Sequence, residues 1–146
     1  MKTVIEKICE RHVDALWEIE KECFSEPWSR NALLDVISNQ YAVYLVAVCD
    51  GVVAGYVGMY TSFEVGAINN IAVSEKFRRR GVAKQLLCAL IEHSRKSGMT
   101  TLTLEVRMSN LAAISLYESF GFTLCGQRRG FYKKPLEDAL IYNLEL

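Results

Sequence analysis

The chain has 146 residues, of which 51% are hydrophobic and 23% charged, and its 17 basic residues balance its 17 acidic ones. A chain of this length can bury most of its apolar surface on folding, so we expect a single domain over residues 1–146. The composition excludes a disordered protein, and the balanced charge argues against a broad nucleic-acid-binding face. Local basic clusters, at residues 76–84 and 128–134, instead favour a small anionic ligand.

The cysteines are odd in number and widely spaced, with no Cys-x-x-Cys or Cys/His ligand pattern. This predicts neither a disulfide framework nor a metal site, and we expect reduced, mostly buried thiols in a cytoplasmic protein. Charged residues interrupt every apolar run before it could span a bilayer, and the N-terminus lacks a signal-type apolar segment. We therefore expect no membrane span and no secretion signal.

The N-terminal part of the chain predicts one strand and two helices. Thr3–Ile8 is expected to form the strand, His12–Phe24 the first helix and Ser29–Ile37 the second. Ser29 is a suitable N-cap, because a serine side chain can accept a hydrogen bond from the first helical turn. The residues expected to face inward are Val13, Leu16 and Trp17 in the first helix and Leu33, Leu34 and Ile37 in the second.

A β-hairpin is predicted next. Tyr41–Cys49 and Val52–Tyr60 are two apolar runs separated by Asp50-Gly51, which is a strong signal for a two-residue hairpin turn. A third strand is expected over Phe63–Val73. Its asparagines, Asn69 and Asn70, are unusual in an apolar strand and indicate an edge or a bulge at this point.

A basic turn and a helix follow this strand. The sequence Arg78-Arg79-Arg80-Gly81-Val82-Ala83 leads into a segment with apolar residues at three- and four-residue intervals, the pattern of an amphipathic helix. Lys96 falls in the last expected turn of that helix and Gly98 directly after it, as is typical of a helix end. The apolar positions are Val82, Ala83, Leu86, Leu87, Leu90 and Ile91.

Such a turn can bind an anion. It directs unpaired backbone N–H groups at one point, and the positive end of the helix dipole and the arginines add to the attraction. A phosphate ester or pyrophosphate would fit, although three arginines in a row are also common in solvated turns. The turn has neither the spacing of a Walker loop nor the three glycines of a dinucleotide-binding fingerprint.

The C-terminal part predicts a strand, a helix and two further strands. Thr101–Arg107 alternates apolar and polar residues, as expected of a strand with one buried face. Ser109 or Asn110 can cap a helix that runs to Phe120, with Gly121 at its end. Thr123–Tyr132 and Ala139–Leu146 are expected to form an antiparallel pair. With helices between these strands, the predicted class is α/β (α+β), a mixed and largely antiparallel sheet flanked by helices.

The chain resembles the GNAT family of acetyl-CoA-dependent N-acetyltransferases in two segments, which follow one another in the order typical of that family. They are RRRGVA at 78–83 and LEVRMSNLAAISLYESFGF at 104–122. Within that family the resemblance is greatest to the bacterial ribosomal-protein-alanine N-acetyltransferases of the RimI type. It extends over essentially the whole chain and is densest from Ala67 to Phe122. It implies the GNAT sheet topology, acetyl-CoA as co-substrate, no metal, and the N-terminal alanine of small-subunit ribosomal protein eighteen as acceptor.

The resemblance also implies which residues hold the co-substrate. The strand before the basic turn would splay away from Thr101–Arg107, so that its backbone can pair with the amides of the pantetheine arm like an added strand. The turn and the start of the helix would hold the phosphates. Asn110 would contact the co-substrate as well as cap its helix. The implied binding residues are Ile71, Ala72, Val73, Arg79, Arg80, Gly81, Val82, Ala83, Lys84 and Asn110.

Two residues are candidates for proton transfer. Acetyl transfer needs a neutral amine, yet an α-ammonium with a pKa of about 8 is mostly protonated at neutral pH, so a base must take its proton. Glu105 could be an idle surface residue on its strand, but the resemblance makes it the general base, acting directly or through a water. Tyr117 could be a core tyrosine, but the resemblance makes it the general acid that faces the sulfur of coenzyme A.

The acceptor is less well defined by the sequence. Aromatic residues in segments 24–29 and 130–132 either pack in loops or line the acceptor channel, as the corresponding loops do in RimI-type proteins. Alternatives to a protein N-terminus are a small amine as acceptor, or a non-catalytic acyl-CoA-binding module. The presence of both Glu105 and Tyr117 argues against the last of these. His12 and His93 have no partners at motif spacing and are expected to be structural or exposed.

Overall fold

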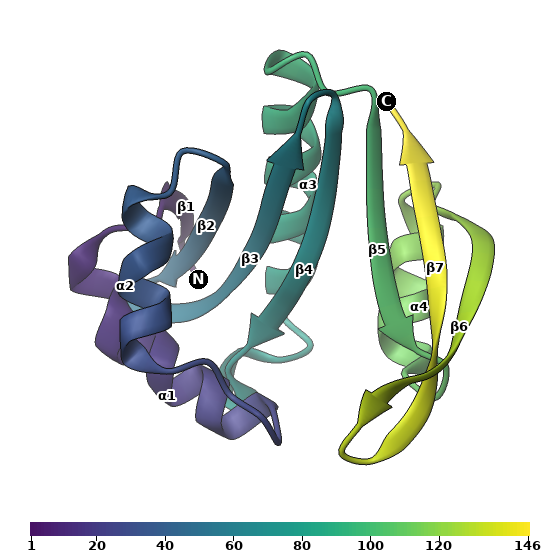
Figure 1. The fold of residues 1–146 in the computed structure, drawn as a ribbon. Coiled ribbons are helices and arrows are strands. Elements are labelled where there is room, and N and C mark those ends of the chain that lie inside the picture. The colour runs from purple at the N-terminus through teal and green to yellow at the C-terminus, as the bar shows by residue number, and fades with distance from the viewer.

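The computed structural model describes residues 1–146, which form a central sheet with helices on both faces (Figure 1). The strand order is β1-β2-β3-β4-β5-β7-β6, and every neighbouring pair is antiparallel except β4 and β5. This confirms the predicted class and sheet type. The strands are β1 (Thr3–Lys7), β2 (Ala42–Cys49), β3 (Val52–Ser62), β4 (Val65–Val73), β5 (Thr101–Arg107), β6 (Thr123–Lys133) and β7 (Leu136–Glu145). The helices are α1 (Val13–Cys23), α2 (Arg30–Ser38), α3 (Val82–Lys96) and α4 (Leu111–Ser119), with 3₁₀ turns at Glu10–His12 and Glu75–Phe77.

Short-range signals in the sequence explain several element ends. Asp50 and Gly51 both have positive φ angles, 48° and 83°, as the tight turn of the β2–β3 hairpin requires. Ser29 caps α2 by accepting a backbone hydrogen bond at 3.1 Å, as predicted. Asn110 does the same for α4 at 3.2 Å, so it is Asn110 rather than Ser109 that caps this helix.

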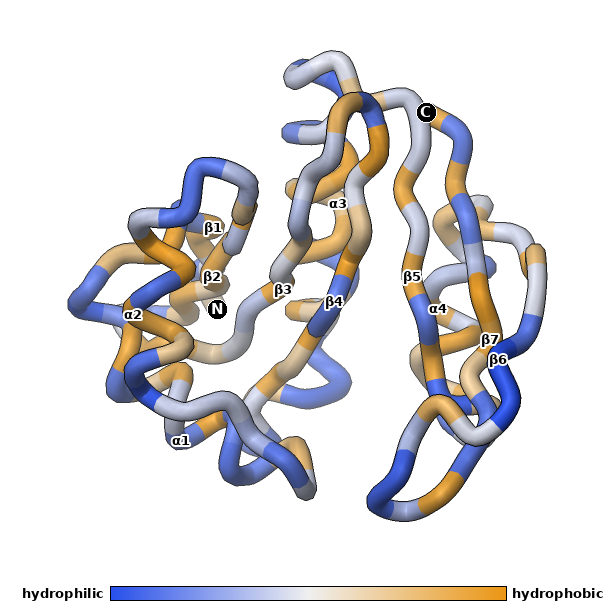
Figure 2. The backbone as a smooth tube through the Cα atoms, in the orientation of Figure 1, coloured by the Kyte–Doolittle hydropathy of each residue, from blue (hydrophilic) through white to orange (hydrophobic).

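Two apolar cores cover the two faces of the sheet. Helices α1 and α2 pack on one face of β2–β4, and α3 packs on the other, so that β3 is buried on both sides through most of its length (Figure 1). The first core includes Leu16, Leu33, Tyr44 and Tyr56, and the second includes Met59, Leu86, Leu87 and Leu90. Hydrophilic residues gather instead in the turn between β4 and α3 and in the β6–β7 hairpin (Figure 2).

The sheet divides between β4 and β5. These strands pair only where Val65–Ile68 lies opposite Thr101–Leu104, although β4 continues to Val73 and β5 to Arg107. Figure 1 shows the two strands side by side at one end and diverging toward the other. The unpaired edges of both strands therefore face the space between two halves of the molecule, β1–β4 and β5–β7.

The asparagine pair lies where this division begins. The β3–β4 register shifts so that Gly58 pairs with Asn70 and Met59 with Ile68, which leaves Asn69 as a bulged residue. The Asn69 amide donates a hydrogen bond to the Tyr44 hydroxyl at 2.7 Å. The bulge indicated by the sequence and the splayed strand implied by the resemblance are thus both present.

Some element boundaries differ from the prediction. Strand β4 begins at Val65, because Phe63, with φ of 54°, belongs to the turn that follows β3. Strand β7 begins at Leu136 rather than Ala139, because the β6–β7 hairpin continues to a tight turn at residues 134–135. In α2 the buried residues are Leu33 and Val36, whereas Leu34 and Ile37 are only partly buried.

The expectation of mostly buried thiols is wrong. All five cysteines are free, but only Cys49 is buried, while Cys9 and Cys23 are partly buried. Cys88 is exposed on α3, and Cys125 is exposed on β6, the strand at the edge of the sheet. Apolar character alone therefore did not indicate which side of an amphipathic element these residues occupy.

Other expected features can be located directly. His12 is buried and His93 is exposed. None of the helices combines the length and apolar character needed to cross a membrane. No group of three or more His, Cys, Asp or Glu side chains is arranged to hold a metal ion.

Candidate active site

The turn between β4 and α3 has a backbone that few residues adopt. Arg79 and Gly81 both lie in the left-handed region, with φ angles of 63° and 77°. A Cβ atom added to Gly81 would meet nothing within 4 Å, so the need for glycine comes from the backbone angle and from the open space in front of it. The turn therefore presents a bare backbone to its surroundings.

A pocket of about 390 Å³ opens at this turn. It extends from the end of β4 across the turn and the first residues of α3 to α4. Its lining residues are Val73, Arg78, Arg79, Gly81, Val82, Ala83, Lys84 and Leu116. Most of the predicted co-substrate residues thus surround one cavity, which lies at the end of the sheet where β4 and β5 have separated.

The electrostatics of the pocket favour an anion. Helix α3 has no side-chain cap, and its first backbone hydrogen bond runs from Gln85 N to Gly81 O at 3.1 Å. The N–H groups of Val82, Ala83 and Lys84 precede that bond and point out of the helix end. Together with the helix dipole and the nearby cationic side chains, these N–H groups have the chemistry to bind an anion such as a phosphate.

Four predicted co-substrate residues do not line this pocket. Ile71 packs against the α3 core, and Ala72 is buried in the core of α1 and α2. The Arg80 guanidinium lies 5.8 Å from the centre of the Phe77 ring, and Asn110 is engaged in capping α4. The packing of the Ile71 and Ala72 side chains does not test the prediction for these residues, which is that their backbone groups pair with the pantetheine arm.

Glu105 lies on the polar face of β5, between buried Leu104 and Val106. Its side chain is 31% exposed, but the Oε2 atom itself is buried and accepts no hydrogen bond. The Arg128 Nε atom lies 3.2 Å from this oxygen, close enough for an ion pair but not aligned for a hydrogen bond. The carboxylate consequently retains an unused acceptor oxygen, which a general base requires.

Tyr117 is buried on α4, with its ring centre 5.7 Å from that of Phe122. Its hydroxyl makes no hydrogen bond within the chain. Burial raises the pKa of Tyr117 well above that of an ordinary phenol, and the nearby Tyr132 raises it further. The phenol therefore stays protonated at neutral pH and can donate a hydrogen bond.

Tyr132 of β6 lies close to both candidates. Its pKa is raised first by burial and then by the negative charge of Glu105, while the charge of Arg107 lowers it. The Arg107 guanidinium carbon lies 4.3 Å from the centre of the Tyr132 ring. One region at the end of β5 thus contains Glu105, Arg107, Tyr117 and Tyr132.

The sequence prediction missed several of these residues. Arg78 lines the pocket and donates from Nε to the Val73 carbonyl at 3.2 Å, and its position three residues before Gly81 could have indicated it. Arg107 lies two residues after Glu105, on the same strand face, and could have been found in that way. Leu116 and Arg128 come from distant parts of the chain and have no local signal.

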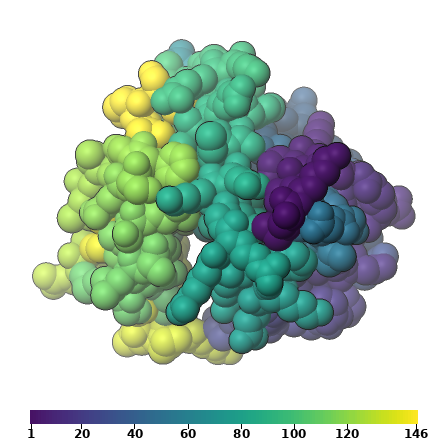
Figure 3. Space-filling view, turned by 180° about the vertical axis from the view of Figure 1, so that it is seen from behind, coloured from purple at the N-terminus to yellow at the C-terminus, as the bar shows by residue number.

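The space-filling view from behind shows a hollow between the chain of α3 with its preceding turn and the chain of α4 (Figure 3). The arginine-containing turn borders this hollow. The division of the sheet is thus accessible from the side on which the pocket lies.

This divided sheet, with a pocket at the N-terminus of α3, is the arrangement expected from the GNAT sheet topology. Residues 13–122 match the acetyltransferase (GNAT) family, and the chain belongs to that family. It is therefore an acetyl-CoA-dependent N-acetyltransferase.

Relatives within the family are more specific. The [ribosomal protein bS18]-alanine N-acetyltransferase of Haemophilus ducreyi is 38% identical over 149 residues, covering 98% of this chain and 100% of the relative. The enzyme of the same name from Salmonella typhimurium is 37% identical over 134 residues and 90% of both chains. The crystal structure of the ribosomal-protein-S18-alanine N-acetyltransferase from Escherichia coli has a TM-score of 0.91 at 32% identity, covering 99% of this chain and 94% of that one. These findings confirm the RimI-type resemblance.

Proposed function

We propose that this enzyme transfers acetyl from acetyl-CoA to the N-terminal α-amino group of a protein, with the N-terminal alanine of ribosomal protein bS18 as its acceptor. The acceptor is supported by the names of relatives that match 90% or more of the chain. The structural observation that carries the proposal is the buried Oε2 atom of Glu105, which accepts no hydrogen bond and lies on the part of β5 that no longer pairs with β4. The reaction takes place in the cytoplasm and requires no nucleic acid, membrane or metal.

The chain's own residues divide the proton transfers between them. Acetyl-CoA, when bound, supplies the acetyl group as a thioester. Glu105 accepts a proton from the acceptor's ammonium group, directly or through a water, and the neutral amine then attacks the thioester carbonyl, so that the new C–N bond replaces the C–S bond and the thiolate leaves. Tyr117 donates a hydrogen bond that strengthens as negative charge develops on the leaving sulfur.

The co-substrate is held mainly by backbone. The N–H groups of Val82, Ala83 and Lys84 bind the pyrophosphate, with Gly81 leaving room for it. The edge of β4 from Ile71 to Val73, which no longer pairs with β5, pairs with the pantetheine amides. Arg79, Arg80 and Lys84 supply positive charge, and Asn110 contacts the co-substrate from the start of α4.

Mass spectrometry of acetylated acceptors tests the proposal. The acceptors are a peptide beginning with alanine, the same peptide with a blocked N-terminus and an internal lysine, and spermidine. We expect the free N-terminal peptide to be acetylated fastest. Preference for spermidine or for the lysine would overturn the N-terminal assignment while leaving the acetyltransferase class intact.

A further inference from the structure

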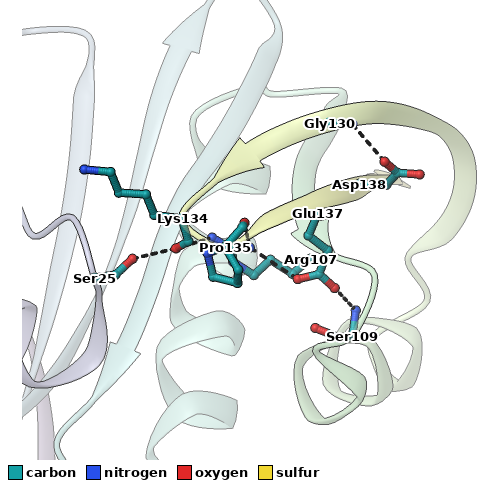
Figure 4. Close-up of polar contacts among 8 residues, drawn as sticks. All are labelled: Ser25, Arg107, Ser109, Gly130, Lys134, Pro135, Glu137 and Asp138. Atoms are coloured by element: carbon teal, nitrogen blue, oxygen red, sulfur yellow. Dashed lines mark hydrogen bonds and ion pairs between the residues drawn. The ribbon is translucent and has the colours of Figure 1, made fainter.

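Two loops meet at the open end of the divided sheet. The α1–α2 loop, residues 24–29, and the β6–β7 turn, residues 134–135, belong to opposite halves of the molecule (Figure 4). The Ser25 hydroxyl donates a hydrogen bond to the Lys134 carbonyl oxygen at 2.8 Å. No other hydrogen bond or ion pair links these two loops, so the contact depends on how accurately the Lys134 carbonyl is placed.

Arg107 determines where that carbonyl lies. Its Nη2 atom donates to Lys134 O at 3.2 Å, and its Nη1 atom donates to Pro135 O at 2.9 Å. The guanidinium also lies against the Tyr132 ring, whose centre is 4.3 Å away. Two carbonyls of the turn and one aromatic ring therefore hold this planar group in a single orientation, as Figure 4 shows for its polar contacts.

Glu137 connects this arrangement to helix α4. Its Oε1 atom pairs with Arg107 Nη1 at 3.2 Å, and its Oε2 atom accepts a hydrogen bond from Ser109 N at 2.7 Å. Ser109 directly precedes Asn110, the cap of the helix that carries Tyr117. The Arg107 and Glu137 side chains are only 27% and 19% exposed, so the pair is better shielded from solvent than an ordinary surface ion pair.

From these contacts we propose that Arg107 is a positioning residue for the acceptor. Its guanidinium holds the 134–135 turn against the α1–α2 loop and, through Glu137, at a fixed distance from the start of α4. The alternation of β5 places Arg107 on the same strand face as Glu105, so the turn is anchored beside the proposed base. This inference rests on the proposed function, because it assumes an acceptor long enough to contact both loops.

The conservative variant Arg107→Lys is a direct test, since an ammonium is a single point of charge and cannot hold two carbonyls and a carboxylate in a fixed plane. We expect the KM for the alanine peptide to rise at least about tenfold, as is typical when hydrogen bonds to a charged group are lost. The affinity for coenzyme A, measured by calorimetry, should remain within about twofold of wild type, because Glu137 can still bind Ser109 N. Arg129→Lys is the matched control, being an exposed arginine of the same hairpin without a hydrogen bond or ion pair, and it should change neither quantity.

Ser25→Ala tests the loop contact without altering the arginine. A rise of about two- to fivefold in peptide KM is expected, in the range of one neutral hydrogen bond. In the Arg107→Lys background the same change should have no further effect, because the Lys134 carbonyl is no longer held in place. Two results would overturn the proposal. One is a KM for the alanine peptide that equals the wild-type value in both single variants. The other is a rise in KM in the double variant equal to the product of the rises in the two single variants. If the wild-type enzyme does not acetylate the alanine peptide, the proposed function fails instead.

Discussion

The side proposed for the co-substrate and the side proposed for the acceptor are built in different ways. The pocket proposed for the co-substrate comes mostly from one continuous segment, residues 73–84, and offers backbone N–H groups, a left-handed glycine and a helix end. The acceptor side joins Ser25, Arg107 and Lys134, which lie far apart in the sequence, through side-chain contacts. Backbone groups can bind a ligand whatever the side chains are, whereas the contacts on the proposed acceptor side depend on the particular side chains of Ser25 and Arg107.

The sharpest test of this division is Glu105→Gln, which removes the proposed base and leaves the pocket untouched. Turnover should fall by about 10²- to 10⁴-fold, the usual contribution of general base catalysis. Coenzyme A affinity, measured by calorimetry, should not change. A variant as active as wild type at neutral pH would show that another group accepts the proton.

Tyr117→Phe should have the next largest effect. Because the hydroxyl makes no hydrogen bond in the chain, its removal should hardly change the thermal unfolding temperature. Turnover should fall by about 10- to 100-fold, the range for a hydrogen bond to a charged group, here the developing thiolate. Equal activity of variant and wild type in steady-state assays would exclude Tyr117 as the acid.

Gly81→Trp addresses the co-substrate side, and Gly98→Trp provides a matched control. Both glycines have positive φ angles, 77° and 82°, and at both a Cβ would meet nothing within 4 Å. The loss of stability should therefore be similar, of about 1–2 kcal/mol for a left-handed L-residue. Only Gly81→Trp should weaken coenzyme A binding, by about tenfold or 1.4 kcal/mol. Unchanged affinity by calorimetry would contradict the phosphate-turn assignment.

Glu137→Gln should give the smallest effect, and one that depends on pH. The hydrogen bond from Ser109 and the charge of Arg107 lower the pKa of Glu137 below its ordinary value. A lowered folded-state pKa stabilises the protein above the unfolded-state pKa, and this contribution is lost as the pH falls through the folded-state value. Urea unfolding should therefore show the variant to be less stable than wild type at pH 7, with the difference shrinking in acid. A difference that is constant with pH would contradict the charge-based role.

The same division between local and distant contacts decided what the sequence could predict. The hairpin at Asp50-Gly51, the caps at Ser29 and Asn110 and the helix that starts at Val82 depend on neighbouring residues, and all were predicted. The topology was not evident from periodicity and followed only from the family motifs. The length of the β6–β7 hairpin was not predicted. Its turn is held by Arg107, which is distant in the sequence, and by Glu137, which is close to the turn but is not a residue type that indicates one.

In the candidate active site too, local motifs were predictable and contacts between distant segments were not. Glu105 and Tyr117 were found because a motif contains them both, and their roles remain predictions. The ion pair of Glu105 with Arg128, and the contact of Ser25 with Lys134, join elements whose proximity arises only from the strand order. No spacing in the sequence indicates such pairs. Their discovery required the three-dimensional structure.

The central claim is that Glu105 takes the proton from an N-terminal amine. The most direct measurement is the ratio of kcat/KM between wild type and Glu105→Gln for the alanine peptide, followed from below to above the amine pKa of about 8. If Glu105 takes this proton, the ratio should be large at low pH and should shrink as the amine becomes neutral by itself. A ratio that does not change across this range, or one close to unity at neutral pH, would contradict it.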